Sequence, residues 1–144
     1  MRRLEPARQQ YAWGSTSAIP ELLGVADDGA PWAEAWYGSH PAGPARVTGG
    51  DALSELIDAE PERLLGEDII WRFGRRLPFL LKLIAPERPL SLQVHPSQAQ
   101  AAEGYALEEE AGIALDHPAR NYKDTNHKPE MVLALTRFQA VAGF

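Results

Sequence analysis

The sequence predicts a mainly β domain that carries two small helical inserts. Residues 90–96, LSLQVHP, alternate apolar and polar side chains, and this period of two is typical of a half-buried strand. Other short segments with the composition of strands are residues 31–38, 77–84 and 129–135. Apolar residues recur instead at helical spacing in 51–66, and residues 97–115 are predicted to be helical and acidic, so we assign these two segments to the inserts.

Order is expected to begin at Tyr11, where two aromatic residues precede a glycine that permits a tight turn. Trp13, the second of these aromatics, either packs on the core or lines a pocket. A short helix is predicted for residues 17–23, because Ser17 can act as its cap.

The segment 31–38 contains a carboxylate between two tryptophans. As a strand it places Trp32, Glu34 and Trp36 on one face, because side chains two residues apart share a face. Glu34 is therefore either solvated, with the rings shielding a sheet edge, or part of a pocket. Residues 39–48 are rich in proline and glycine and are predicted to form a loop.

The first insert is predicted to contain two helical turns. Asp51 can act as the N-cap, and the apolar residues of 53–57 form a stripe. Pro61 can start a second short turn, which is expected to end at Gly66.

The strand 77–84 contains Lys82 among apolar residues. A lysine buried in such a strand without a partner costs several kcal/mol. Lys82 therefore either reaches solvent at an edge or faces a polar cavity, and we expect the cavity.

The second insert begins at Ser97, which can cap a helix. The three glutamates of 108–110 are expected to be a solvated run without a catalytic role. Gly104 and Gly112 are expected to divide the helical segment, and His117 after it is expected to be exposed.

Two predicted strands carry the residues of greatest chemical interest. Gln93 and His95 lie on one face of the strand 90–96, and Glu130 lies on one face of the strand 129–135. If the two strands share a sheet or barrel, an amide oxygen, an imidazole and a carboxylate can converge. Three such groups can hold a divalent cation and leave positions open for a substrate.

The sequence stops at Gly143 and Phe144, after a last short strand that is predicted to follow Arg137. A complete sheet protein is not expected to end on an apolar strand, so we expect the chain to be the N-terminal part of a longer protein. By itself the chain is expected to be inactive and to aggregate, because an open barrel exposes unpaired strand edges.

Composition excludes several classes of partner. The chain has 144 residues, 44% of them hydrophobic, which is enough for one domain with its own core. Its 14 basic and 20 acidic residues give a net charge of −6 without a basic stripe, which argues against nucleic acid. There is no cysteine, no apolar run that could span a bilayer and no secretory signal pattern. We therefore expect a soluble, cytoplasmic protein without a membrane partner.

Five strings of the sequence resemble type I mannose-6-phosphate isomerases, also called phosphomannose isomerases. They are YAWG from Tyr11, PWAEAWYGSHP from Pro31, LPFLLKLI from Leu77, PLSLQVHP from Pro89 and NYKDTNHKPEMVLALTRFQAVAGF from Asn121. QVHP and NHKPE at this separation are highly specific, whereas either string alone is weak. The resemblance implies a cupin-type (jelly-roll) barrel, of which residues 1–144 would be the N-terminal part of the catalytic domain. It also implies a protein that is a monomer at full length and acts in GDP-mannose biosynthesis.

The resemblance further implies roles for individual residues. The implied metal ligands are Gln93, His95 and Glu130, with Zn²⁺ as the cofactor and Mn²⁺ or Co²⁺ as alternatives. The implied catalytic residues are Lys82, His127 and Lys128, and the implied substrate-binding residues are Trp13, Glu34 and Ser91. The family's fourth ligand, a histidine, and an arginine that covers the substrate have no counterpart in this chain. Ser97 and Gln98 depart from the acidic-basic pair that the family commonly has after QVHP.

The implied reaction interconverts mannose 6-phosphate and fructose 6-phosphate through an enediol. Negative charge builds on the carbonyl oxygen, and a divalent cation can stabilise it as a Lewis acid. A positioned general base adds a factor of about 10²–10⁴, and His127 is a candidate for this role. Lys82, Lys128 and Ser91 could bind oxyanions.

Two alternatives remain open from the sequence. A non-catalytic cupin-like protein that binds metal or sugar is possible if the chain is complete. A metal-dependent dioxygenase of cupin type would need a His-x-His pair, and Gln93 occupies the place of the first histidine. Gln93 therefore argues against the dioxygenase.

Overall fold

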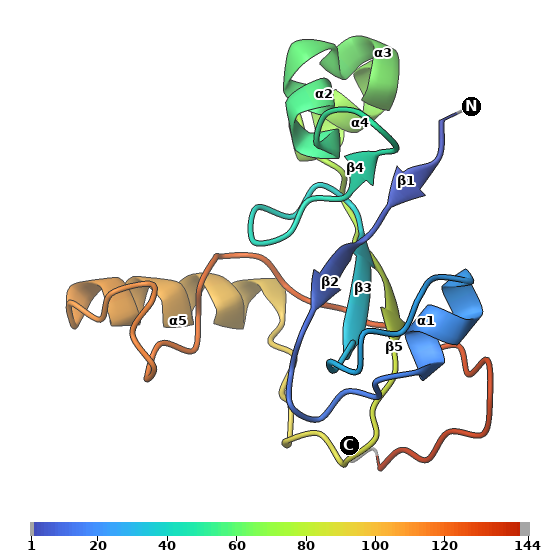
Figure 1. Cartoon of the computed structure of the whole chain (residues 1–144). Helices are drawn as coiled ribbons and strands as arrows, with labels where there is room; N and C mark the ends of the chain where they lie inside the picture. Colours follow the sequence, from blue (N-terminus) through green and yellow to red (C-terminus); the bar gives the residue numbers. More distant parts are fainter. Residues whose placement is uncertain (1, 142–144) are drawn as a thin grey trace. The chain divides into compact units, whose positions relative to one another are not determined.

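A three-stranded antiparallel sheet organises the first part of the computed structural model, which describes residues 2–141 (Figure 1). Its strands, with β3 in the centre, are β2 (Ala7–Gln9), β3 (Glu34–Tyr37) and β5 (Leu81–Ile84). A two-stranded ladder pairs β1 (Leu4–Glu5) with β4 (Arg46–Val47). All of these strands belong to a first unit, residues 1–91, and residues 92–144 form a second unit.

The core of the first unit is built mainly from small side chains. Trp36 of β3 lies opposite Ala7 of β2 and Lys82 of β5. Ala33 and Ala35 have no exposed surface, so the segments around β3 can approach its backbone closely. The buried apolar residues of this unit include Ile19, Ala33, Ala35, Trp36, Ala45, Ala52 and Ile57.

Order begins earlier in the chain than Tyr11, contrary to the sequence prediction. β1 and β2 both precede Tyr11, and β2 pairs with β3 in antiparallel register. Strands of two or three residues carry too little alternation to be recognised, and their stability comes from partners that are distant in the sequence.

Short helices lie between the strands of the first unit. Within the described residues they are α1 (Ala18–Leu23), α2 (Leu53–Ala59), α3 (Pro61–Leu65) and α4 (Glu67–Phe73). The helix predicted for residues 17–23 is confirmed as α1. The first insert is longer than the predicted 51–66, because Gly66, at φ 80°, ends α3 and a further helix, α4, follows directly.

The N-cap of α2 is Ala52 rather than the predicted Asp51. The backbone N–H of Ala52 donates to Oε2 of Glu55 at 2.8 Å. A side chain of the first turn thus provides the acceptor for the N–H group at the start of the helix. Glu55 therefore holds the N–H of the N-cap residue, whereas Asp51 was expected to accept an N–H of the first turn.

Only the second half of the predicted strand 77–84 is a strand. Tyr37, the last residue of β3, pairs with Leu81, the first residue of β5. Residues 77–80 lie beyond the end of β3 and have no partner in this ladder. The prediction was wrong there because apolar composition indicates a strand but cannot show how far its neighbour extends.

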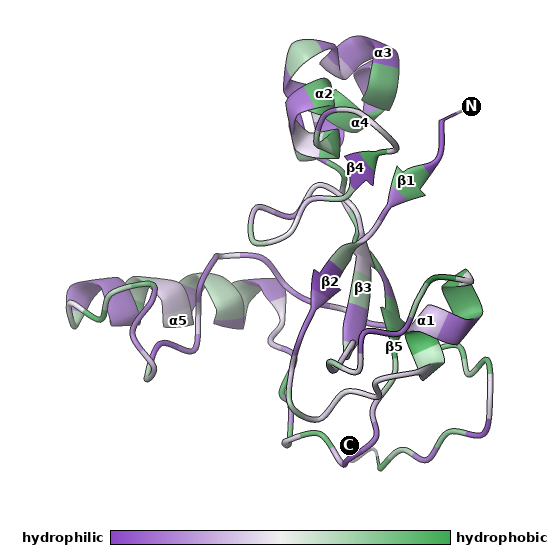
Figure 2. Ribbon diagram, viewed as in Figure 1, coloured by the Kyte–Doolittle hydropathy of each residue, from purple (hydrophilic) through white to green (hydrophobic). Residues whose placement is uncertain are grey.

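The second unit contains α5 (Gln98–Glu110) and long irregular segments (Figure 1). Ser97 caps α5 as predicted, and its Oγ accepts a hydrogen bond from the N–H of Gln100. Gly104 does not divide the helix, and α5 ends at Glu110 instead of continuing to residue 115. Figure 2 shows hydrophilic and hydrophobic residues mixed along α5. No helix in the described part of the chain is both long and apolar enough to cross a membrane.

The predicted strands 90–96 and 129–135 are not formed as strands. Neither segment has a ladder partner among the described residues, and a strand needs a neighbour for its backbone N–H and C=O groups. Leu92 and Met131 are 95% and 93% exposed. The last predicted strand, after Arg137, is likewise not formed at residues 138–141, and residues 142–144 lie outside the described part.

Gly14 is expected to be essential for packing in the first unit. It is buried, it forms a β-bridge with Pro86, and a Cβ at this position would lie 2.4 Å from Cα of Ala33. We expect Gly14→Ala to lower the free energy of unfolding by about 1–3 kcal/mol, because backbone atoms must move to relieve the clash. Urea denaturation followed by tryptophan fluorescence measures this loss.

The matched control is Gly50→Ala, where the added Cβ would meet its nearest atom, the carbonyl oxygen of Val47, at 3.6 Å, an ordinary contact. Its free energy of unfolding is expected to change much less than that of Gly14→Ala. Equal losses in the two variants would contradict the assignment of close packing to Gly14.

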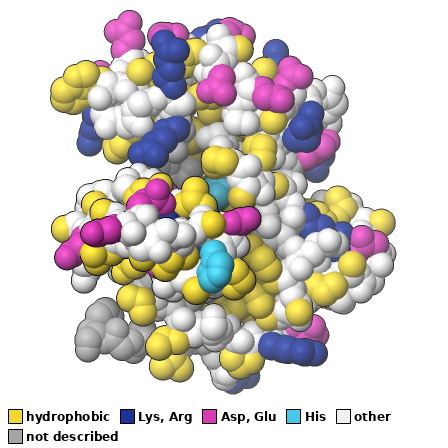
Figure 3. All heavy atoms as spheres, turned by 90° about the vertical axis from the view of Figure 1, so that its left-hand side faces the viewer, with side chains coloured by type: hydrophobic (Ala, Val, Ile, Leu, Met, Phe, Trp, Pro, Cys, Tyr) yellow, Lys and Arg dark blue, Asp and Glu magenta, His cyan; other side chains and the backbone are white. Residues whose placement is uncertain are grey.

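Apolar side chains lie exposed on both unpaired segments of the second unit, and hydrophobic side chains are spread over the face seen in Figure 3. The exposed residues of these segments include Leu92, Val94, Met131, Leu133 and Leu135. We expect residues 1–144, expressed alone, to self-associate at about 10 μM and above, because extended apolar segments with unpaired backbone groups pair with other copies. Sedimentation velocity over a concentration series measures this association.

The double variant Leu92→Lys with Leu133→Lys is expected to raise the monomer fraction, since it charges one position on each segment. The control, Leu22→Lys, charges an exposed leucine of α1 in the first unit and is expected to have little effect. A chain that is monomeric at every concentration would contradict the prediction.

Candidate metal-binding and acid–base site

His95 and Glu130 are the predicted metal ligands that the structure brings into contact. Nε2 of His95 lies 3.3 Å from Oε2 of Glu130, and both side chains are partly exposed to solvent. They come from two segments of the second unit that are far apart in the sequence. An imidazole nitrogen and a carboxylate oxygen at this separation can face a common ion.

Gln93 lies two residues before His95 and is exposed. No hydrogen bond that the structure describes joins its side chain to His95 or Glu130. No group of three His, Asp or Glu side chains within residues 2–141 is close enough to hold a metal ion. The donor types nevertheless fit a zinc ion, because an imidazole nitrogen and a carboxylate oxygen meet and an amide oxygen is available from the same segment as the imidazole.

Lys128 lines a cavity of about 530 Å³ in the second unit. The other lining residues are Leu92, Val94, Pro96, Asn121, Tyr122, Lys123, Asp124 and Asn126. Nζ of Lys128 lies 3.8 Å from Oδ2 of Asp124, so the ammonium group is close to a carboxylate group of the same cavity wall. A cavity with an apolar wall and a few polar groups can accept a small polar ligand.

His127 adjoins Lys128 and is exposed. Its backbone N–H points to Oε1 of Gln98 at 3.5 Å, while its side chain remains accessible. An accessible imidazole next to a lysine can take part in proton transfer. His117, by contrast, is exposed in a loop as predicted, and its Nδ1 accepts the N–H of Ala119.

Lys82 and Glu34 form a second cluster, in the first unit. Nε1 of Trp36 donates to Oε2 of the buried Glu34 at 2.5 Å, which confirms that Glu34 and Trp36 share a face of β3. Nζ of Lys82 lies 3.9 Å from the same carboxylate oxygen and 5.1 Å from the centre of the Trp36 ring. Lys82 therefore has a charged and an aromatic partner, and about a third of its side chain remains exposed.

Trp13 and Ser91, the other predicted substrate-binding residues, also belong to the first unit. The ring of Trp13 stacks on Tyr11 with the ring centres 5.4 Å apart, and its carbonyl oxygen accepts the N–H of Glu87. Ser91 is exposed in the irregular segment after β5. No contact that the structure describes joins Trp13 or Ser91 to the Lys82 cluster.

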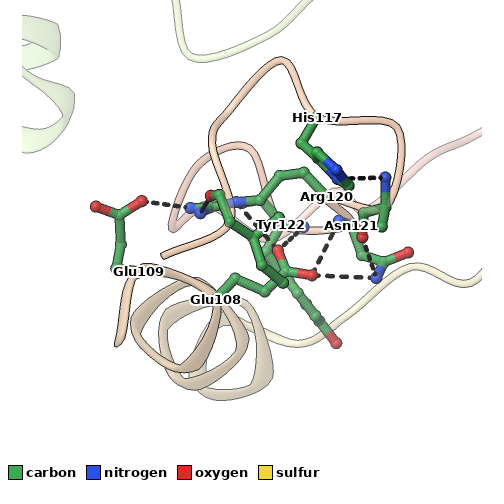
Figure 4. A network of polar contacts seen from close by, with 8 residues as sticks. Glu108, Glu109, His117, Arg120, Asn121 and Tyr122 are labelled. Carbon is green, nitrogen blue, oxygen red and sulfur yellow. Dashed lines mark hydrogen bonds and ion pairs between the residues drawn. The ribbon is translucent and has the colours of Figure 1, made fainter. Parts of the chain in front are cut away.

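Sequence reasoning missed a buried polar network on α5 (Figure 4). Glu108 is buried rather than solvated, and Arg120 has a fully buried side chain, with its Nε 3.1 Å from Oε2 of Glu108. The available signal was the spacing of Ala101, Gly104 and Glu108, which puts the glutamate on the same helical face as two small residues. That face is buried in the structure.

The Glu108 carboxyl has a pKa below its usual range. Burial by itself would raise this pKa, but hydrogen bonds from the backbone N–H groups of Asn121 and Tyr122 and from the Asn121 side chain stabilise the ionised form. The nearby charge of Arg120 acts in the same direction. Glu108 is therefore held as an anion that accepts several hydrogen bonds at once.

Comparisons with known proteins agree with the sequence strings. The family model described as "Phosphomannose isomerase type I, catalytic domain" matches residues 1–144. A mannose-6-phosphate isomerase of Escherichia coli K12 is 46% identical over 149 residues, which cover 100% of this chain and 38% of the relative. The human mannose-6-phosphate isomerase is 39% identical over 154 residues, which cover 98% of this chain and 34% of the relative.

Solved structures match as well. A mannose 6-phosphate isomerase from Salmonella typhimurium, bound to the substrate F6P and to zinc, matches with a TM-score of 0.81 and 44% identity, covering 89% of this chain and 33% of that chain. Another, bound with zinc and yttrium, matches with a TM-score of 0.80, 44% identity and 88% and 33% coverage. The chain thus spans little more than a third of the length of the curated relatives that it matches.

Proposed function

Because the chain belongs to the type I phosphomannose isomerase family, we propose that the protein containing it interconverts mannose 6-phosphate and fructose 6-phosphate. We also propose that residues 1–144 are the N-terminal part of its catalytic domain. The observation that carries the proposal is the approach of His95 to Glu130, since these residues belong to the two family-specific strings QVHP and NHKPE. The relatives reported above are named as isomerases, which does not favour a non-catalytic sugar or metal binder.

Gln93, His95 and Glu130 are the proposed ligands of one zinc ion. Zinc is supported by the two similar solved structures that contain it, and by a donor set of nitrogen and oxygen atoms that zinc accepts. Mn²⁺ or Co²⁺ would be tolerated by the same ligands. When bound, the ion would act as a Lewis acid toward the oxygen of the sugar carbonyl.

The remaining residues have proposed roles in binding and proton transfer. The isomerisation removes a proton from the carbon next to the carbonyl and returns one to the neighbouring carbon. His127 is the proposed proton carrier, because its imidazole is accessible and adjoins a cation. Lys128 and Lys82 are proposed to bind oxyanions, either the phosphate or the charge that develops on the enediol.

Substrate contacts are further proposed for Trp13, Glu34 and Ser91, which match pocket positions of the family. Glu34 is supported by its contact with Lys82, because a buried carboxylate beside the ammonium limits the orientations that the lysine can adopt. A cytoplasmic location, a monomeric state and a place in GDP-mannose biosynthesis are proposed from the family resemblance.

The proposed function is tested with the protein expressed from its complete reading frame. Zinc is removed with a chelator, the metal-free protein is assayed with mannose 6-phosphate, and zinc is returned in measured amounts. Formation of fructose 6-phosphate is expected to stop and then to recover in proportion to the bound zinc. Activity that is independent of metal, or no turnover of mannose 6-phosphate by the zinc-loaded protein, would overturn the proposal.

A further inference from the structure

One face of α5 is shaped to receive the segment that follows the helix. Ala101, Gly104 and Glu108 are buried along this face. A Cβ on Gly104 would lie 2.4 Å from the ring of Tyr122, so the absence of a side chain allows the aromatic ring to approach the helix. The close approach brings the backbone around Tyr122 within reach of the Glu108 carboxylate.

Glu108 and Arg120 attach this segment near its beginning (Figure 4). Oε1 of Glu108 accepts the N–H of Asn121 at 3.0 Å, and Oε2 accepts the N–H of Tyr122 at 2.8 Å. Nε of Arg120 donates to the carbonyl oxygen of Tyr122 at 2.7 Å, and its Nη1 donates to the carbonyl oxygen of Ile113 at 2.5 Å. Both polar backbone groups of Tyr122 are therefore held by side chains.

Gln98 attaches the same segment near its end, from the first residue of α5. Its Nε2 donates to the carbonyl oxygen of Thr125 at 2.6 Å, and its Oε1 lies 3.5 Å from the N–H of His127. Between the two attachments, Oδ1 of Asp124 accepts the N–H of Asn126 at 2.8 Å and closes a turn. Polar contacts thus hold the segment to both ends of one helix.

Apart from the Tyr122 ring, which packs against Gly104, packing contributes little to the position of this segment. None of the residues 121–130 is buried, so beyond the contact of Tyr122 with Gly104 it is mainly hydrogen bonds to α5 that hold the backbone. His127 is part of the second attachment and is followed by Lys128, Pro129 and Glu130, and Glu130 is the residue that meets His95. A displacement of residues 121–126 would therefore also displace His127, Lys128 and Glu130.

We propose that Glu108 and Gln98 are positioning residues, which hold residues 121–130 along α5 so that Glu130 and His127 face the site that begins at His95. This inference rests on the proposed function. Neither side chain is a proposed ligand of the metal, and both act through the backbone that carries the ligand. Groups that hydrogen-bond directly to a metal ligand typically change metal affinity or activity about 10–100-fold when they are replaced, and we expect an effect of this size to be transmitted through the backbone here.

The test uses Glu108→Gln and Gln98→Ala in the protein expressed from its complete reading frame, with Glu110→Gln as the matched control. Glu110 is an exposed glutamate on the same helix and takes no part in the attachment. Hydrogen–deuterium exchange measures the amide protection of residues 121–128. Chelator competition measures the dissociation constant for zinc. The visible spectrum of the cobalt-loaded protein reports the geometry of the metal ligands.

We expect the amides of Asn121 and Tyr122 to lose protection in Glu108→Gln, and the amide of His127 to lose protection in Gln98→Ala. The zinc dissociation constant is expected to rise about 10–100-fold in both variants, with a changed cobalt spectrum, while Glu110→Gln behaves as the unmodified protein. Gln98 is exposed, so Gln98→Ala provides the test if Glu108→Gln does not fold.

The outcomes distinguish a failure of this inference from a failure of the proposed function. If the unmodified protein binds zinc and turns over mannose 6-phosphate, but both variants keep its zinc affinity and cobalt spectrum, the positioning role is overturned and the isomerase activity stands. If the unmodified protein neither binds zinc nor turns over the sugar phosphate, both conclusions fail. A loss of thermal stability without any change in zinc affinity would indicate a structural role alone and would also overturn the inference.

Discussion

His95→Ala is expected to lower kcat/KM for mannose 6-phosphate about 10³-fold in the protein expressed from its complete reading frame. His95 and Glu130 are the two proposed ligands already in contact, so the variant loses one of the donors that would hold the ion. An ion that is lost or displaced no longer stabilises charge on the carbonyl oxygen, and about 4 kcal/mol of lost stabilisation corresponds to this factor in rate. A coupled assay for fructose 6-phosphate measures the loss, with zinc content determined on the same sample.

His117→Ala is the matched control for this prediction. His117 is also an exposed histidine of the second unit, but its Nδ1 accepts the N–H of Ala119 at 3.1 Å and it lies outside the proposed ligand set. Its zinc content and kcat/KM are expected to match those of the unmodified protein. A His95→Ala protein that retains both zinc and activity would show that the ligand set is wrong.

The chemistry of the candidate site could be read from the sequence more fully than its geometry. Alternation along 90–96 indicated that Gln93 and His95 share a side, and the structure places His95 against Glu130. The pairing of these segments as strands was predicted and is not formed, because alternation identifies residues that can be buried without identifying the strand that buries them. The side chains that can bind an ion are recognised within a short segment of the sequence. The strand pairing that would hold them in place depends on segments that are distant in the sequence.

The fold was predictable at the level of class. The similarity to solved isomerase structures, with a TM-score of 0.81, confirms the cupin-type fold. The short strands β1 and β2 could not be found, because each is defined by a partner that lies at least 25 residues further along the chain. The helix α5 was found through Ser97 and its composition, since capping is determined within one turn of the chain.

Glu108 illustrates why a run of like charges can mislead. The sequence EEE at 108–110 is typical of a solvated helix face, and Glu110 is indeed exposed. Glu108 is buried because it follows Ala101 and Gly104 on one face, and because Arg120 returns to that face from the loop. Its burial depends on an arginine 12 residues away in a segment without regular structure, and no local pattern predicts such a partner.

Arg120→Ala is expected to be the most destabilising substitution in the second unit, with a loss of about 3–5 kcal/mol in the free energy of opening α5 and the segment after it. The side chain is fully buried and lies 3.1 Å from Glu108 and 2.8 Å from Glu109. Removing it also leaves the carbonyl oxygens of Ile113 and Tyr122 without their donor. Native-state hydrogen exchange of the α5 amides measures the opening free energy.

The control is Arg137→Ala, which removes an exposed arginine of the same unit and is expected to change the opening free energy by no more than about 0.5 kcal/mol. A loss below about 1 kcal/mol in Arg120→Ala would contradict the prediction. The double variant Arg120→Met with Glu108→Leu then separates stability from positioning. It leaves neither charge buried alone, so it is expected to recover part of the opening free energy. It still lacks the acceptor for the N–H groups of Asn121 and Tyr122, so zinc affinity is expected to remain weak even where α5 regains its protection.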